Sequence, residues 1–131
     1  MLERVKTIAE GEPYPQHLGI KLVESAQDRA VLCLPYRACL GLDRMHRGAI
    51  SSLVDVAAVC AFWSHPDIDP DARGATVCFS INFLREATAL DLIATATVRR
   101  RGRKICVAHV SVTTDAGEEI AVVTVTTMLS D

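Results

Sequence analysis

The sequence predicts an α+β fold in which a curled antiparallel sheet of about six strands wraps around one long central helix. Three observations lead to this prediction. One segment, residues 47–64, has the length and apolar content of a buried helix. Short strand-like segments precede it and continue after it to the end of the chain. A single helix is shielded from water on most of its sides only if the sheet curls around it.

The helix prediction rests on composition and on a clear end signal. Eleven of the fourteen residues 49–62 are apolar, and the exceptions are Ser51, Ser52 and Asp55. A helix of this composition must be buried on almost every side. A histidine-proline pair at 65–66 ends it, because proline disfavours helical geometry in the residue before it.

The other elements follow from local pattern. Residues 1–10 are predicted to form a helix that stops at Gly11, and Pro13 and Pro15 place the next segment in a loop. Two strands joined by a turn are expected at 20–26 and 30–34. After the long helix, four strands are predicted to form an antiparallel meander: 75–84, 92–100, 105–113 and 120–129.

The strand at 75–84 alternates strictly between apolar and more polar residues. This alternation predicts one face formed by Ala75, Val77, Phe79, Ile81 and Phe83. The opposite face would carry Thr76, Cys78, Ser80 and Asn82.

Length and composition restrict the class of protein. The 131 residues are predicted to form one domain, 1–131, with residues 1–17 as an N-terminal helix and loop leading into it. A net charge of −2 gives no general affinity for nucleic acid or anionic membranes, and no segment resembles a membrane span or a signal peptide. Five scattered cysteines lack metal-ligand spacing, so we expect buried reduced thiols, no metal site and a cytoplasmic protein.

Asp55 is an acidic residue in the middle of a predicted helix that is otherwise mostly apolar, and burial in the core does not explain its presence there. An ionised carboxylate among apolar neighbours such as Val54 and Val56 carries a desolvation cost, so it requires compensation or a purpose. It is a candidate catalytic group. An acid that lines a solvent channel, or that accepts a hydrogen bond from a neighbouring strand, would fit the same pattern.

His46, Arg47 and Gly48 stand at the start of this helix. Free backbone N–H groups at a helix start stabilise anions, and they could stabilise the oxyanion that forms when a thioester carbonyl is attacked. The same three residues could equally be an ordinary histidine cap followed by a glycine that permits close packing.

Arg47 and Asp55 cannot serve one site from one helix. They are eight residues apart, which is about 12 Å along a helix axis. A base and an oxyanion donor must both lie about 3 Å from one reacting carbonyl. Two antiparallel copies could each lend Asp55 to the other's helix start, and open sheet edges favour such pairing. The active unit is therefore predicted to be at least a homodimer.

Two motifs resemble one family. The run 45–50, Met-His-Arg-Gly-Ala-Ile, followed by Leu53-Val54-Asp55, resembles the signature of the PaaI-like branch of hotdog-fold thioesterases, in which Asp stands nine residues after His. Residues 75–85, ending in Phe-Leu-Arg, are similar to the family's next strand. The resemblance extends from about Leu18 to the C-terminus. Its fold, a curled sheet around one helix, is the one that the pattern of elements predicts.

The resemblance implies hydrolysis of an acyl-CoA thioester. Asp55 would activate water or attack the carbonyl itself. In the His46 motif, the Arg47 backbone amide would donate to the oxyanion and Gly48 would let the acyl chain approach. The Thr76 hydroxyl would hold the water or the carboxylate. The reaction would need no metal and no cofactor besides the coenzyme A of the substrate, and the family habit is a homotetramer.

The chain departs from the family pattern at four positions. Arg47 replaces the first Gly of the motif, so its side chain must point away or contact the substrate. Leu40 stands where an Asn often orients the nucleophile, Cys78 where many relatives have Asp, and Glu86 where they have Pro. A non-catalytic acyl-CoA or acyl-lipid binding module is therefore the alternative function. A dehydratase is disfavoured, because no separate His-plus-acid pattern is present.

Residues 99–104, Arg-Arg-Arg-Gly-Arg-Lys, form the one strong charge run. Guanidinium groups suit the phosphates of coenzyme A. The run could equally be a solvated hairpin tip that guards a sheet edge. The residues predicted to bind substrate are Arg99, Arg101, Arg103, Lys104 and Asn82.

Overall fold

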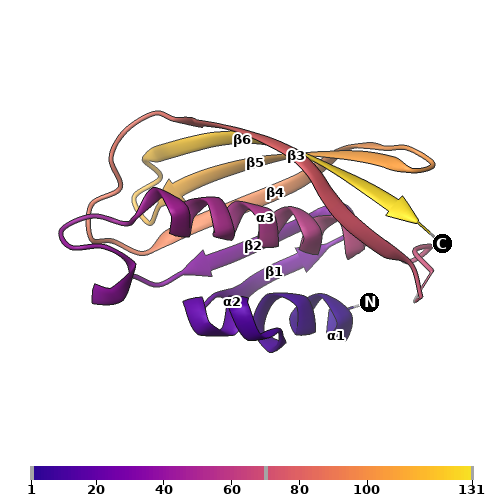
Figure 1. Ribbon diagram of the computed structural model, residues 1–131, viewed down its shortest axis with the longest axis horizontal. Helices are drawn as coiled ribbons and strands as arrows, with labels where there is room; N and C mark the ends of the chain where they lie inside the picture. The colour runs from indigo at the N-terminus through magenta and orange to yellow at the C-terminus, as the bar shows by residue number, and fades with distance from the viewer. Residues whose placement is uncertain (1, 70, 131) are drawn as a thin grey trace.

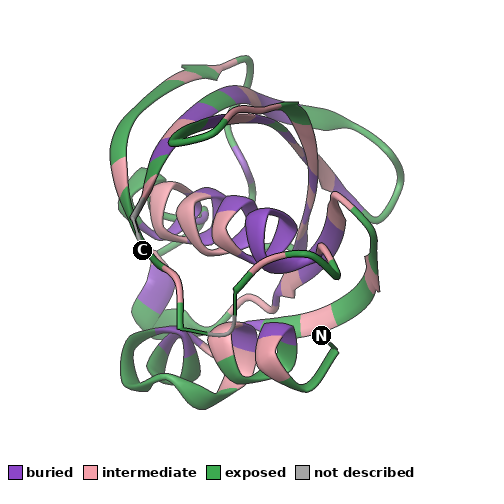
Figure 2. Cartoon of the chain, turned by 90° about the vertical axis from the view of Figure 1, so that its right-hand side faces the viewer, coloured by how far each residue is buried: buried purple, intermediate pink, exposed green. Residues whose placement is uncertain are grey.

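The computed structural model describes residues 2–69 and 71–130, and it confirms the predicted α+β fold. A six-stranded antiparallel sheet in the order β1-β2-β4-β5-β6-β3 curls around the helix α3, Arg47–Trp63 (Figure 1). In Figure 2 the sheet arches over this helix, and the N-terminal helices lie beneath it. The strands are β1 Lys21–Ala26, β2 Arg29–Leu34, β3 Arg73–Phe83, β4 Leu92–Arg101, β5 Ile105–Thr114 and β6 Glu119–Ser130.

The predicted meander of the last four strands is wrong in one respect, because β3 does not pair with β4. β3 lies at the edge of the sheet beside β6, and β4 lies between β2 and β5. The connection from β3 to β4 is too long for a tight hairpin. It passes the start of α3 instead, where the Met45 amide donates to the Ala87 carbonyl at 2.8 Å. Strands β1 and β3 are consequently the two edges of the sheet.

The N-terminal segment contains more helix than predicted. α1, Leu2–Lys6, continues into a π-helical turn, Thr7–Gly11, and α2 covers Pro13–Leu18, which the sequence placed in a loop. The prolines permit α2 because both stand in its first turn, where the N–H groups have no intrahelical partner. Gly19 ends the helix in the left-handed conformation, at φ 82°. The buried apolar side chains of the segment join the main core: Val5, Ala9 and Leu18.

The helix α3 is buried on most of its surface, as its composition predicts. Ten of its 17 residues are buried, so the sheet and the N-terminal helices cover most of its sides. The partly exposed ones are three or four residues apart and share one stripe of the helix. This stripe comprises Ser51, Ser52, Asp55, Val56 and Val59. The rest of the chain therefore covers only partly the side of α3 that carries Asp55.

All five cysteines are free thiols, but the prediction that they are buried is wrong for two of them. Cys39 and Cys78 are exposed, whereas Cys60 and Cys106 are buried and Cys33 is half-buried. Burial, with a smaller contribution from Glu12, raises the pKa of Cys60 to about 12. The Cys60 thiol therefore stays protonated at neutral pH and belongs to the core.

Arg101 turns inward from the basic run and braces the end of α3. Its guanidinium donates to Asp28 Oδ1 from Nε at 3.1 Å and from Nη2 at 2.8 Å, and Nη2 also donates to the Phe62 carbonyl at 3.0 Å. That carbonyl lies in the last turn of the helix, where carbonyls lack intrahelical partners. The two side chains are only 22% and 35% exposed. Arg101 thus joins β4, the turn between β1 and β2, and the helix end.

Replacing Arg101 with Met should lower the free energy of unfolding by about 1.5–3 kcal/mol, because it leaves a half-buried Asp28 without its cation. Arg99 on the same strand is exposed, so Arg99→Met is the matched control, with an expected change below about 0.5 kcal/mol. Urea unfolding followed by circular dichroism measures both variants. Equal destabilisation by the two substitutions would contradict the brace.

Candidate active site

His46 caps the start of α3. Its backbone is extended, at φ −62° and ψ 136°, and its imidazole Nδ1 accepts a hydrogen bond from the Gly48 amide at 2.8 Å. Nδ1 can accept only while it carries no proton, so the cap requires a neutral imidazole. A Cβ at Gly48 would lie 2.9 Å from the same nitrogen, so glycine is needed here for the close approach of the ring.

The cap leaves one amide of the first turn without an acceptor. The amides of Ala49 and Ile50 donate to the His46 carbonyl, and the Gly48 amide donates to the imidazole. Within the part of the chain that the structure describes, the Arg47 amide has no such partner. A free N–H at a helix start, with the positive end of the helix dipole behind it, is suited to stabilise an oxyanion.

Asp55 is held by Thr76 across the gap between α3 and the edge strand. The Thr76 hydroxyl donates to Asp55 Oδ1 at 2.6 Å, and both residues are half-buried. A hydrogen bond to an ionised carboxylate is among the stronger ones, and it partly compensates the desolvation of the charge. Because Oδ1 is engaged by threonine, Oδ2 is the oxygen left to accept a proton.

A β-bulge in β3 turns Thr76 toward Asp55. The strict alternation predicted for this strand is therefore wrong at the bulge. Thr76 pairs with Thr127, but Cys78 pairs with Thr126, so Val77 is the extra residue. Beyond the bulge, Phe79 pairs with Val125. The buried residues of β6 alternate from Ala121 to Thr127. Paired residues share a face, so Thr76 lies on the same face as Phe79, Ile81 and Phe83, which the sequence had placed opposite it. Re-aiming of a side chain beside a site is a known use of bulges.

Sequence reasoning missed Tyr14, which reaches the partly exposed stripe from α2. Its hydroxyl lies 2.9 Å from Ser52 Oγ. The Ser52 hydroxyl donates to the Gly48 carbonyl at 3.0 Å, so the tyrosine is the donor in this pair. The Tyr14 side chain is 57% exposed. The N-terminal segment therefore places an aromatic ring near the catalytic candidates, and the pattern of a short proline-rich loop gave no sign of it.

A cavity of about 220 Å³ opens beside the start of α3. The Arg47 guanidinium lies over the Phe83 ring, 5.2 Å from its centroid, so its side chain is directed to the cavity. The full lining is Arg44, Met45, His46, Arg47, Ile50, Phe83, Arg85, Glu86 and Ala87.

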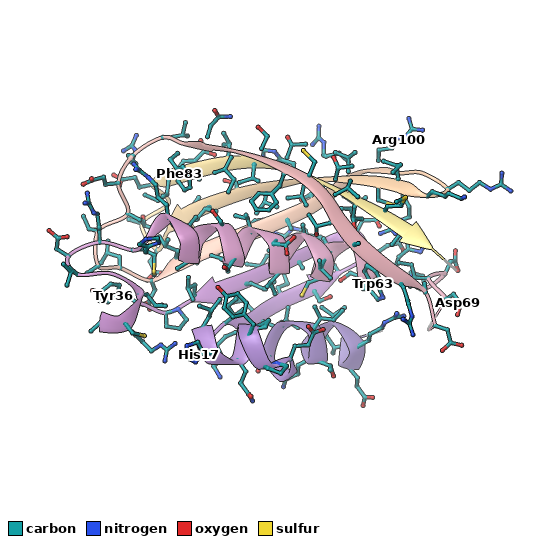
Figure 3. The ribbon with its side chains drawn as sticks, viewed as in Figure 1. His17, Tyr36, Trp63, Asp69, Phe83 and Arg100 are labelled. Atoms are coloured by element: carbon teal, nitrogen blue, oxygen red, sulfur yellow. The ribbon has the colours of Figure 1, made fainter. Side chains whose placement is uncertain are left out.

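The predicted substrate-binding residues do not all gather in one place. Arg99, Arg103 and Lys104 are exposed, while Arg101 forms the brace described above. Figure 3 shows Arg100 of this run at the opposite end of the molecule from Phe83. Asn82 pairs with Val122 and lies on the outer face of β3, away from the Thr76 face. Within the described residues, none of these side chains forms a hydrogen bond or ion pair with Asp55, whose partner is Thr76.

Residues 2–69 and 71–130 match neither the pattern of a metal site nor that of a membrane-spanning helix. No three His, Cys, Asp or Glu side chains in these ranges are grouped to hold a metal ion. None of the helices in the same ranges has both the length and the hydropathy of a membrane span.

The fold and this carboxylate define a hotdog-fold protein with a polar site on its central helix. The sequence model of the thioesterase superfamily matches residues 42–121 of this chain. A Halobacterium salinarum protein named as an esterase is 33% identical over 104 residues, which cover 76% of this chain and 68% of that protein. The chain therefore belongs to the thioesterase superfamily, whose activity is the hydrolysis of thioesters.

Solved structures agree with this assignment. A thioesterase family protein from Silicibacter pomeroyi superimposes with a TM-score of 0.88 at 29% identity, over 98% of this chain and 96% of the other. The PaaI protein from the phenylacetic acid degradation operon of Escherichia coli superimposes with a TM-score of 0.87 at 22% identity, over 99% and 93% of the two chains. At 22% identity, the similarity to the PaaI protein shows only that the two chains share a fold.

Replacing His46 with Ala should lower the free energy of unfolding by about 1 kcal/mol, because it removes the acceptor for the Gly48 amide. His46→Asn is the control, since asparagine is a good N-cap and should retain most of the stability. Thermal unfolding of the three proteins at one concentration provides the comparison. If the Asn variant is as unstable as the Ala variant, the imidazole does not act as a cap.

Proposed function

We propose that the protein hydrolyses an acyl-CoA thioester to the free acid and coenzyme A, with Asp55 as the catalytic carboxylate. The observation that carries the proposal is the Thr76–Asp55 hydrogen bond of 2.6 Å. It holds a half-buried carboxylate in one orientation on the partly exposed stripe of α3. A catalytic base needs such positioning, because a misplaced base loses much of its effect.

The proposed reaction begins with water bound at Asp55. Oδ2 takes a proton from this water while the water oxygen forms a bond to the thioester carbonyl carbon. The carbonyl oxygen becomes an oxyanion and accepts a hydrogen bond from the free Arg47 amide. When the tetrahedral intermediate collapses, the carbon–sulfur bond breaks and the thiolate receives the proton from Asp55. Direct attack by Asp55, through an anhydride that water then opens, would use the same groups. Neither route requires a metal or a further cofactor.

The distance between the two groups makes the proposed site dimeric. Arg47 and Asp55 stand at the first and ninth positions of α3, so they are about 12 Å apart along its axis. The edge strand β3 is exposed on both faces, and Val77 and Phe79 are 51% and 40% exposed. An exposed edge strand favours pairing with a second copy. A two-fold axis would run the paired α3 helices antiparallel, and each Asp55 would approach the other helix start.

The same symmetry supports a role for the basic hairpin. This hairpin, formed by β4 and β5, carries Arg100 at the opposite end of the molecule from Phe83, which lines the cavity beside α3 (Figure 3). In an antiparallel dimer the partner's hairpin would be carried toward that cavity. We assign the phosphates of coenzyme A to Arg99, Arg103 and Lys104, with Arg101 as the brace that holds their strand. A substrate contact at Asn82, assembly to a tetramer, membership of the PaaI-like branch and a cytoplasmic location stay predictions.

A panel of short, medium, long and aromatic acyl-CoAs, followed by release of free thiol, tests the proposal. Asp55→Asn should lower kcat by at least about 100-fold, the scale of general base catalysis. Thr76→Val should lower it by about 10-fold through loss of a hydrogen bond to a charged group, and Thr76→Ser, which keeps the hydroxyl, by less than about 3-fold. Undiminished turnover in Asp55→Asn would remove Asp55 from this role. Binding of coenzyme A without turnover of any thioester would favour the acyl-CoA binding module.

A further inference from the structure

The cavity beside α3 has an excess of positively charged side chains in its lining. Its lining includes the guanidinium groups of Arg44, Arg47 and Arg85 and the single carboxylate of Glu86. The chain as a whole has a net charge of −2. This local excess of positive charge is therefore opposite in sign to the overall charge, and it favours an anionic ligand in the cavity.

The three guanidinium groups differ in what they contact. Arg44 forms an ion pair with Glu86, and Arg85 forms one with Glu118 at 3.0 Å. Arg47 has no carboxylate partner in residues 2–69 and 71–130. Its guanidinium carbon lies 5.2 Å from the centroid of the Phe83 ring, within the range of a cation–π contact. A cation–π contact uses none of the hydrogen bonds that a guanidinium can donate, so the N–H groups of Arg47 remain able to bind a carboxylate with two parallel hydrogen bonds.

Covalent geometry limits which anion could reach Arg47 in a bound acyl-CoA. The guanidinium carbon lies within about 7 Å of the same residue's backbone nitrogen, the proposed donor to the oxyanion. The extended pantetheine arm separates the thioester sulfur from the nearest phosphorus by roughly 15 Å at ordinary bond lengths. A carboxylate at the end of a five-carbon acyl chain lies about 5 Å from the thioester carbon. The distance therefore fits a charge on the acyl group better than a phosphate of coenzyme A.

We propose that Arg47 is a specificity-determining residue that selects short acyl groups with a terminal carboxylate. The substrate class is then the coenzyme A monothioesters of short dicarboxylic acids. The inference rests on the proposed thioester hydrolysis. Water still adds to the thioester carbonyl and the thiol still leaves, and the terminal carboxylate is unchanged in the product. By binding the terminal carboxylate, Arg47 holds the acyl chain extended and keeps this carboxylate away from the thioester of the same substrate molecule.

Glutaryl-CoA and valeryl-CoA are matched probes, because their acyl chains both have five carbons and only one carries a charge. The measured quantity is the ratio of kcat/KM for glutaryl-CoA to kcat/KM for valeryl-CoA, after subtraction of the uncatalysed rate. This ratio should exceed one in the unmodified protein. Arg47→Met should lower it about 10- to 100-fold, the scale of hydrogen bonds to a charged group. Arg44→Met, which removes a guanidinium already paired with Glu86, should lower it less than about 3-fold.

A binding measurement separates failure of the inference from failure of the proposed function. Isothermal titration of Asp55→Asn, with and without Arg47→Met, compares the affinities of the two thioesters without turnover. Tighter binding of glutaryl-CoA that is lost with Arg47→Met supports the inference even if neither compound is hydrolysed. Hydrolysis with valeryl-CoA favoured, or a ratio that Arg47→Met does not change, overturns the inference and leaves the thioesterase function standing. Circular dichroism of each variant shows that it is folded.

Discussion

The hydrogen bond from Thr76 to Asp55 joins the two parts of the molecule on which the site depends. A carboxylate in the middle of an apolar helix needs a donor, and the edge strand supplies one at 2.6 Å. The donor is available only because the bulge at Val77 turns Thr76 to the helix side of the sheet. The rest of the sheet buries α3 and fixes its distance from β3, so the packing of the core positions the proposed base.

The same packing leaves the site divided. The chain leaves the first residues of α3 exposed and the stripe that contains Asp55 partly exposed, and it leaves side chains on both faces of β3 exposed. The capped helix start, with its free Arg47 amide, lies two turns away from Asp55 on the same helix. The proposed second copy across β3 would cover the exposed edge and the stripe, and it would bring the two separated groups together. In that proposal, assembly and chemistry are directly linked.

Much of the fold could be predicted from the sequence, because it depends on patterns that are local in the chain. The helix α3 was predicted from its apolar residues and from the proline that follows it. The candidate site was predicted from the spacing of His46 and Asp55. The position of β3 beside β6 depends on the path of a long connection, which no local pattern encodes. The bulge was missed because Val77 continues an apolar alternation. Arg101 was predicted to bind substrate with the rest of its run, but it pairs with Asp28 through a contact between distant segments that no local pattern encodes.

A mixing experiment tests the shared site most directly. Proline is tolerated at the first position of a helix, and His46 already has the extended backbone that proline requires before it, so Arg47→Pro should remove only the side chain and the proposed oxyanion donor. With valeryl-CoA as substrate, Arg47→Pro and Asp55→Asn should each be inactive alone, while Arg47→Ala, which keeps the amide, retains turnover of this uncharged thioester. Unfolding and refolding the two inactive variants together should restore about a quarter of the activity, because half of the dimers then contain one intact site. No recovery from dimers that are shown to have mixed would contradict a site shared between two copies.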